Sequence, residues 1–203
     1  MSLVFNEDDH SYFVDGKRVP SVTEVCSMLT ADKYSGGQAL IHAAAVRGTA
    51  VHELCALYDM DALPDEIDPS YSGYLKAWAA FCRDYRPQWL WIEKPLGSQR
   101  LAGTVDRIGI IDGHTVIVDI KTTSSMDRVS KISLACQLAA YAYLAMYSGI
   151  NVIYDAGIGV QLRKDGTYTV HRQKKIEEKY GFSSVMLFRH MREIINLQKG
   201  YEE

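Results

Sequence analysis

An Asp-Gly dipeptide at 112–113 separates two runs of alternating apolar residues, 101–111 and 114–122. A D-G turn between two period-two segments predicts a β-hairpin in the middle of the chain. If the turn is symmetric, the residue numbers of every facing pair add to 225, so Asp106 faces Asp119. The spacing therefore predicts two carboxylates opposite each other on neighbouring strands, with Cβ atoms about 4.5–5.5 Å apart.

Two facing carboxylates repel each other, and this repulsion must be offset. Because alternate residues of a strand share a face, Lys121 lies beside Asp119. A divalent cation held by the carboxylate oxygens of Asp106 and Asp119 offsets the repulsion most simply. Such a metal ion polarises a phosphate and lowers the pKa of a bound water, and Lys121 could orient or deprotonate that water. The pattern thus favours phosphodiester hydrolysis.

Less specific interpretations remain open at this point. Asp119 and Lys121 could form an ordinary exposed ion pair, and Asp106 with Arg107 could be an incidental surface feature. A protonated carboxylate pair would also reduce the repulsion. A turn of odd length would shift the register and separate the two aspartates. Spacing alone does not decide among them.

The rest of the chain predicts one α/β domain over residues 1–203, with a small central mixed sheet flanked by helices. Short N-terminal strands form a β-hairpin, and the capping box Ser21–Glu24 starts the first helix. We expect Gly48 to interrupt the next helix, so that Thr49 caps its second part. The further expected elements are helices at 38–60, 71–85, 132–147 and 184–199, and strands at 89–95, 152–162 and 167–172.

Composition sets broad limits on the class of protein. The chain has 203 residues, 47% of them hydrophobic, and a net charge of −3, which argues mildly against a protein that coats nucleic acid. Residues 71–203 nevertheless carry an excess of basic side chains. The sequence lacks a run of about 18 apolar residues, which a membrane-spanning helix would need. The acidic segment 1–9 also lacks the pattern of a signal peptide, so we expect a cytoplasmic protein. The four dispersed cysteines predict reduced core thiols.

Four ordered elements of the sequence resemble the P-D-(D/E)-x-K nuclease superfamily, in the branch of RecB-type nuclease domains and phage RecE-like exonucleases. These elements are Arg47-Gly-Thr-Ala-Val-His52, Gly103-Thr-Val-Asp106, Val118-Asp119-Ile120-Lys121-Thr122 and Gln137-Leu-Ala-Ala-Tyr141. The segment from Tyr12 to Thr23 also looks like the start of phage-type members. Asp119 stands where many members have Glu, and either residue can serve as a ligand.

The resemblance implies a restriction-endonuclease-like core and a role for each matching residue. Asp106 and Asp119 would be metal ligands together with the Ile120 main-chain carbonyl, and Lys121 would be the catalytic lysine. His52 would contribute to the metal site. Glu93 occupies a place where some relatives supply another acidic residue. Gln137 and Tyr141 would support the site and contact nucleic acid, although the sequence alone favours a core tyrosine with the glutamine at its polar edge.

The resemblance further implies a deoxyribonuclease that uses Mg²⁺ or Mn²⁺, and the phage-like start favours an exonuclease acting in recombination or replication. We expect DNA as substrate, no membrane, and either a homo-oligomer or a recombination partner protein. No iron–sulfur cluster is expected because the last cysteine is Cys136, and no ATP because a Walker A motif is lacking. A structure-specific endonuclease and a non-catalytic DNA-binding subunit on the same fold remain alternatives.

Overall fold

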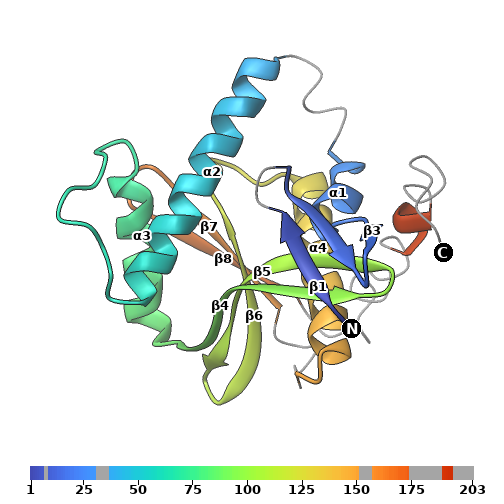
Figure 1. The fold of residues 1–203 in the computed structure, drawn as a ribbon. Helices are drawn as coiled ribbons and strands as arrows, with labels where there is room; N and C mark the ends of the chain where they lie inside the picture. Colours follow the sequence, from blue (N-terminus) through green and yellow to red (C-terminus); the bar gives the residue numbers. More distant parts are fainter. Residues whose placement is uncertain (7–8, 31–36, 151–156, 174–188, 194–203) are drawn as a thin grey trace.

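The computed structural model describes all residues except 7–8, 31–36, 151–156, 174–188 and 194–203. Within this part of the chain, a five-stranded mixed sheet has the order β4-β5-β6-β7-β8 (Figure 1). Its pairs are antiparallel except for β6 and β7, which run parallel. The strands are β4 (Gln88–Ser98), β5 (Leu101–Ile111), β6 (His114–Lys121), β7 (Gly157–Leu162) and β8 (Tyr168–Gln173).

Helices cover both faces of this sheet. Helices α2 (Gln38–Asp59) and α3 (Ser72–Tyr85) pack on one face, where Trp78 joins a buried cluster with Val118. Helix α4 (Arg128–Tyr147) packs on the other face, where Leu134 and Tyr141 join a cluster with Ile117. The predicted fold, a central mixed sheet flanked by helices, is confirmed.

The N-terminal residues form a small sheet of their own. Strands β1 (Leu3–Asn6), β2 (Ser11–Val14) and β3 (Lys17–Val19) pair antiparallel, so the predicted hairpin is extended by a third strand. Helix α1 (Val22–Ser27) follows, with the predicted capping box between Ser21 and Glu24. This sheet is tied to β5, because the Tyr12 hydroxyl lies 2.9 Å from Thr104 Oγ1.

The predicted break at Gly48 is wrong, because α2 is one uninterrupted helix of 22 residues that includes Gly48. Glycine in a helix interior costs only about 1 kcal/mol relative to alanine, which tertiary packing easily overrides. Helix α4 begins four residues earlier than predicted, where the Asp127 side chain accepts a hydrogen bond from the Ser130 amide. Of the predicted helix at 184–199, residues 189–193 are helical and the others lie outside the described residues. The first part of the predicted strand at 152–162, residues 152–156, also lies outside them.

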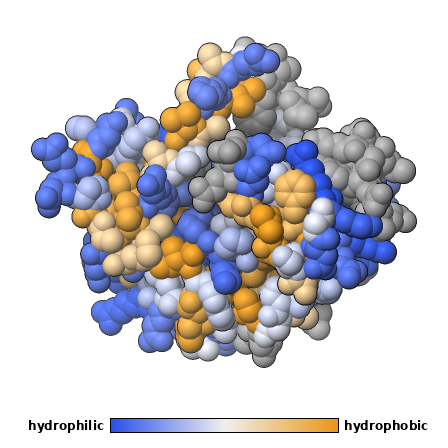
Figure 2. Space-filling view, viewed as in Figure 1, coloured by the Kyte–Doolittle hydropathy of each residue, from blue (hydrophilic) through white to orange (hydrophobic). Residues whose placement is uncertain are grey.

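Burial explains the apolar composition of α4. Among the described helices, α4 alone is long and apolar enough to cross a membrane, yet 56% of its apolar window is buried inside the fold, as in the core helix of a globular domain. The cysteines are all free, and Cys26, Cys55 and Cys136 are buried, as predicted for core thiols. The N-terminal half of α2 projects from the domain (Figure 1), and hydrophobic and hydrophilic residues both lie on the surface of the molecule (Figure 2). Leu40 in this half of α2 is exposed.

Candidate active site

The site lies at the point where strands β5 and β6 separate, which we call the fork. The predicted register is confirmed, because the ladder pairs Ile108 with Ile117 and Arg107 with Val118, and both pairs add to 225. Pairing stops there, one position before Asp106. The Asp106 carboxylate instead accepts a hydrogen bond of 2.6 Å from the Ile120 amide. A side chain thus takes an amide that a continuing ladder would have used, and this bond fixes the carboxylate at the fork.

Asp119 and Lys121 lie together on the α4 side of the sheet. Ile117 belongs to the cluster under α4, whereas Val118 and Ile120 belong to the cluster under α2 and α3, as strand alternation requires. The Lys121 ammonium lies 2.8 Å from Asp119 Oδ2. Beyond this ion pair, the buried Asp119 Oδ2 has no further hydrogen-bond partner among the described residues.

His52 reaches the same fork from α2. Its Nε2 lies 3.0 Å from the Ile120 carbonyl oxygen, and its Nδ1 lies 3.5 Å from Asp106 Oδ1 and 3.8 Å from Glu93 Oε1. One ligand atom from each of His52, Glu93 and Asp106 can be chosen so that all lie within 4.8 Å of one another. When Nε2 donates its proton to the Ile120 carbonyl, Nδ1 is left facing the two carboxylates.

The carboxylates at the fork shift the pKa values of the whole cluster. Burial alone would lower the pKa of His52, but the charges of Asp106 and Glu93 raise it to about 9. Burial and the nearby Asp106 raise the pKa of Glu93 to about 7. Burial opposes ionisation of Asp106 too, but His52 and Lys121 keep its pKa below the ordinary value. Burial raises the pKa of Asp119 despite the attraction of Lys121. Burial and the repulsion by Asp106 therefore oppose the ionisation of Glu93 and Asp119.

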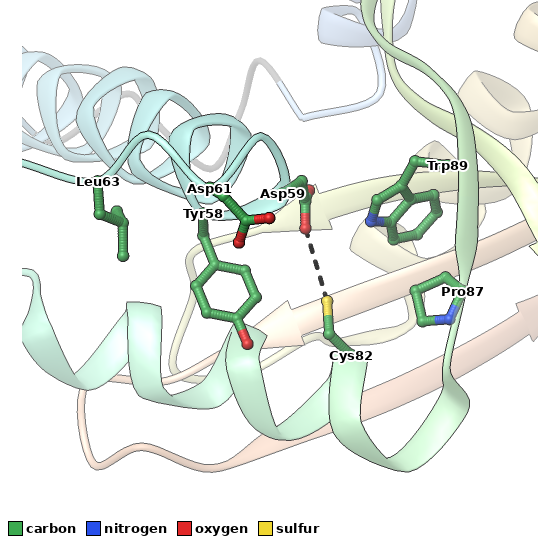
Figure 3. Close-up of a pocket in the computed structure, with 7 residues that line it drawn as sticks. All are labelled: Tyr58, Asp59, Asp61, Leu63, Cys82, Pro87 and Trp89. Carbon is green, nitrogen blue, oxygen red and sulfur yellow. Dashed lines mark hydrogen bonds between the residues drawn. The ribbon is translucent and has the colours of Figure 1, made fainter.

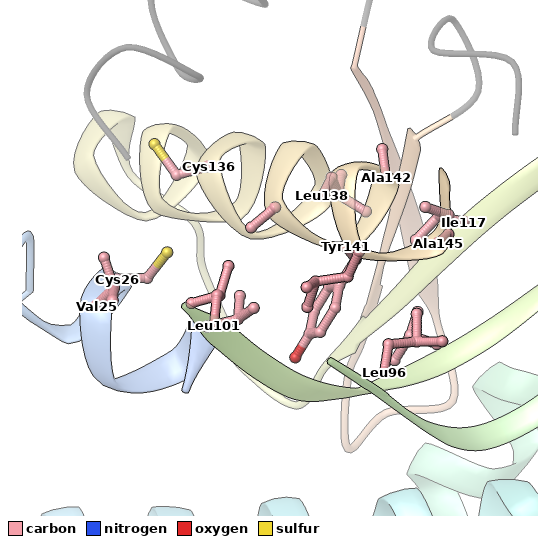
Figure 4. Packing of buried hydrophobic residues seen from close by; sticks show 14 of the residues in the cluster. Val25, Cys26, Leu96, Leu101, Ile117, Cys136, Leu138, Tyr141, Ala142 and Ala145 are labelled. Atoms are coloured by element: carbon pink, nitrogen blue, oxygen red, sulfur yellow. The ribbon is translucent and has the colours of Figure 1, made fainter. Parts of the chain in front are cut away.

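Gln137 and Tyr141 lie on the inward side of α4, and both are buried. Tyr141 points from α4 toward the strands (Figure 4), and its Cε1 lies 3.0 Å from the position that a Cβ on Gly103 would occupy. Burial and the charges of Asp106 and Asp119 raise the pKa of the Tyr141 hydroxyl well above its ordinary value. The structure thus brings Tyr141 near both aspartates, and Gln137 Oε1 is buried with no partner in the described part of the chain.

Two arginines beside the site form contacts that the sequence does not indicate. Arg47 Nη2 donates to the Thr122 carbonyl at 3.2 Å, a contact that fixes the end of β6. Arg107 is completely buried, so the interpretation of Asp106 and Arg107 as a surface feature is wrong. Its guanidinium contacts Asp59 and Glu93. Nothing in the local sequence pairs Arg107 with Asp59, which is 48 positions away.

The donor set fits a hard divalent cation. Carboxylate oxygens and a main-chain carbonyl are the groups that such ions take in proteins, and the imidazole nitrogen adds a ligand of the kind that transition-metal ions accept. Burial raises the pKa of Asp119 even beside Lys121, and Asp106 repels Glu93, and a cation would relieve both effects. A mixed sheet between helices, with acidic side chains and a lysine where two strands part, defines the restriction-endonuclease-like class of fold and site.

Comparison with protein families confirms this class. Residues 38–161 match the family model described as the PD-(D/E)XK nuclease superfamily, a span that includes every candidate site residue. The chain belongs to this superfamily, whose members are nucleases that use divalent metal ions. A comparison with curated proteins finds no match. A solved structure described as "Crystal structure of SSO0001" has 16% sequence identity and a TM-score of 0.44, over 91% of this chain and 79% of that chain.

Proposed function

We propose that this protein hydrolyses phosphodiester bonds in DNA with Mg²⁺ or Mn²⁺ held at the fork between β5 and β6. The observation that carries the proposal is the convergence of His52, Glu93 and Asp106 within 4.8 Å, beside the ion pair of Asp119 and Lys121. Asp106 and Asp119 would be ligands, together with His52 through Nδ1, Glu93, and the Ile120 carbonyl. A metal ion bound by these groups would polarise the phosphate and lower the pKa of a water molecule.

Lys121 would orient the attacking water and stabilise negative charge on the phosphate. Burial by itself would lower its pKa, but the neighbouring carboxylates of Asp119 and Asp106 raise it above the ordinary lysine value. Lys121 thus keeps its proton, which supports a role as hydrogen-bond donor over a role as base. About a third of its side chain reaches solvent, so the ammonium is accessible to a substrate.

Gln137 and Tyr141 would act mainly by supporting the site. Both are buried, and Tyr141 packs against β5 near Gly103, so its ring is shielded from a macromolecular ligand. This burial favours the supporting role over the direct nucleic-acid contact that the resemblance also implied. The buried Gln137 Oε1 would accept a hydrogen bond from a group that enters the site.

For the mode of cutting, we propose an exonuclease acting in recombination or replication. The resemblance of residues 12–23 to phage-type members supports this choice, and a structure-specific endonuclease is the alternative. The complete set of Asp106, Asp119 and Lys121 argues against a subunit that only binds DNA, because binding alone needs no metal-loading carboxylates.

One experiment separates these functions. End-labelled linear DNA and closed circular DNA are incubated with Mg²⁺, Mn²⁺ or EDTA, with wild type, Lys121→Ala and the matched control Lys76→Ala, an exposed lysine of α3. We expect metal-dependent loss of linear DNA only, and a reduction by about 100-fold or more in Lys121→Ala, since a preorganised donor that stabilises developing negative charge contributes on that order. Lys76→Ala should cut like wild type.

The other outcomes are equally informative. Nicking of circular DNA would identify an endonuclease. Activity that survives both EDTA and Lys121→Ala would refute the mechanism. Tight DNA binding without cleavage under either metal would show that the protein is a non-catalytic binding subunit.

A further inference from the structure

A chain of buried charges runs from the end of α2 to the candidate metal site. The Arg107 side chain is 0% exposed and that of Asp59 is 1% exposed. Arg107 Nε donates to Asp59 Oδ2 at 2.7 Å, and its Nη1 donates to Glu93 Oε1 at 2.9 Å and to the Asp106 carbonyl at 2.6 Å. One guanidinium thus connects Asp59 to two residues of the metal cluster.

Burying these charges is an expensive way to fill the core. Taking an arginine and a carboxylate out of water costs free energy that their mutual attraction only partly returns, and apolar residues of similar volume often stabilise a core as well or better. Arg107 Nη2 is moreover buried with no hydrogen-bond partner within the described residues. The arrangement is thus better explained by what it holds in place than by stability.

What it holds is a strained residue. Glu93 has a φ of 46°, in the left-handed region, in the middle of β4. The pairs on either side, Ile92 with Arg107 and Lys94 with Val105, place Glu93 across from Asp106. A non-glycine residue in this conformation costs free energy and persists only where its surroundings hold it. Arg107 makes the shorter of the two described side-chain contacts to Glu93 Oε1, at 2.9 Å against 3.8 Å for His52 Nδ1, and it is the hydrogen bond that holds this conformation.

Asp59 in turn fixes Arg107. Trp78 Nε1 donates to Asp59 Oδ1 at 3.0 Å, and the Arg107 guanidinium carbon lies 5.5 Å from the centre of a Trp78 ring. Cys82 Sγ also points at Asp59 Oδ1, at 3.7 Å (Figure 3). Both oxygens of Asp59 therefore have partners, and the guanidinium has one preferred orientation.

We propose that Arg107, anchored by Asp59, is a positioning residue that holds Glu93 against Asp106 and His52 and thereby sets the affinity of the site for its divalent metal ion. This inference rests on the proposed function for its biological meaning, but it concerns metal binding and can be tested without DNA. Groups behind metal ligands commonly change metal affinity by 10- to 100-fold when they are removed.

The test is calorimetric titration of the full chain with Mn²⁺ in the absence of DNA. Asp59→Asn removes the charge that anchors Arg107 and keeps the side-chain shape. This choice is important because Asp59 also lines a pocket of about 510 Å³ between α2, α3 and β4, which Asp59→Ala would enlarge (Figure 3). The matched control is Asp61→Asn, which makes the same chemical change at an exposed residue of the same pocket.

We expect Asp59→Asn to weaken Mn²⁺ binding by about 10-fold and Asp61→Asn to leave it unchanged. Glu93→Gln should also weaken binding. The double variant Asp59→Asn with Glu93→Gln should bind no more weakly than Glu93→Gln alone, because Asp59 acts through Glu93. At saturating Mn²⁺, Asp59→Asn should regain most of its DNA cleavage, as expected for a defect in metal affinity.

Wild-type Mn²⁺ affinity in Asp59→Asn, or losses that add fully in the double variant, would overturn the proposal. If Asp59→Asn does not fold, as judged by circular dichroism, the pair Asp59→Asn with Arg107→Met replaces it, because removing both charges leaves neither the fully buried arginine nor the fully buried aspartate unpaired. This pair must also bind Mn²⁺ more weakly. A wild type that binds Mn²⁺ but never cuts DNA contradicts the nuclease function alone, and one that binds no Mn²⁺ contradicts both proposals.

Discussion

His52 illustrates how the acidic cluster makes a single side chain sensitive to pH. Two carboxylates outweigh the effect of burial and raise its pKa to about 9, compared with about 6.5 in an unfolded chain. Protonated His52 therefore stabilises the metal-free fold fully below pH 6.5. That contribution is lost as the pH rises from 6.5 through 9.

We expect the difference in free energy of unfolding between wild type and His52→Gln, measured in EDTA by urea denaturation, to decrease by about 1–3 kcal/mol between pH 6 and pH 10. The upper figure follows from the pKa shift, and partial exposure of the side chain reduces it. The same substitution at His114, an exposed residue next to the β5–β6 turn, is the matched control. A constant difference for His52→Gln would contradict the coupling.

The sequence could predict the positions of Asp106, Asp119 and Lys121, because a two-residue turn fixes a register that continues unchanged to Arg107 and Val118. It could not predict what Arg107 does. Val105 and Ile108 both pack in the cluster under α4, three positions apart, so the alternation of faces is interrupted between them. Strict alternation would have placed Arg107 with Val105, away from the helix that carries Asp59.

Among the secondary-structure elements, two helical glycines should respond in opposite ways to the same substitution. A Cβ on Gly48 of α2 would have only Thr122 Oγ1 within reach, at 3.9 Å, an ordinary contact. A Cβ on Gly73 of α3 would come within 1.8 Å of the Lys164 carbonyl oxygen. This second contact is with backbone, so helix and turn must separate.

We therefore expect Gly48→Ala to raise the free energy of unfolding by about 0.5–1 kcal/mol and Gly73→Ala to lower it by about 1–3 kcal/mol. Each can be measured by urea denaturation of the single variants. Equal effects would show that helix propensity, rather than the packing of α3 on the β7–β8 turn, controls stability at both positions.

Helix α4 was predictable in type and position but not in its start. Apolar periodicity located 132–147, whereas the first turn at 128–131 depends on the side chain of Asp127 as a cap and carries few apolar residues. For α2, the sequence showed the destabilising residue but not the packing that outweighs it. The cost of Gly48 was visible in the sequence, but the packing of Val51 and Cys55 against the sheet, which outweighs it, was not.

For the molecule as a whole, a net charge of −3 and an acidic site should make DNA binding depend on metal. The carboxylates of Glu93, Asp106 and Asp119 repel a phosphate unless a cation neutralises them. In the Lys121→Ala variant, in which cleavage should be slowed by about 100-fold or more, we expect fluorescence anisotropy to show tighter binding of a labelled duplex in Mg²⁺ than in EDTA at equal ionic strength. Equal affinity in the two buffers would show that DNA binds away from the acidic site.

The parallel pairing of β6 with β7 also affects the order in which the protein can be built. Strands β4, β5 and β6 follow one another as antiparallel neighbours, so Glu93, Asp106 and Asp119 can be aligned before the residues beyond 122 have left the ribosome. Strand β7 is separated from β6 by α4 and its flanking residues. Until it arrives, β6 is an edge strand with buried-type residues on both faces, from Val116 to Ile120. Nascent chains of this protein therefore pass through a stage in which the strand that carries Asp119 and Lys121 is open to pairing with other chains.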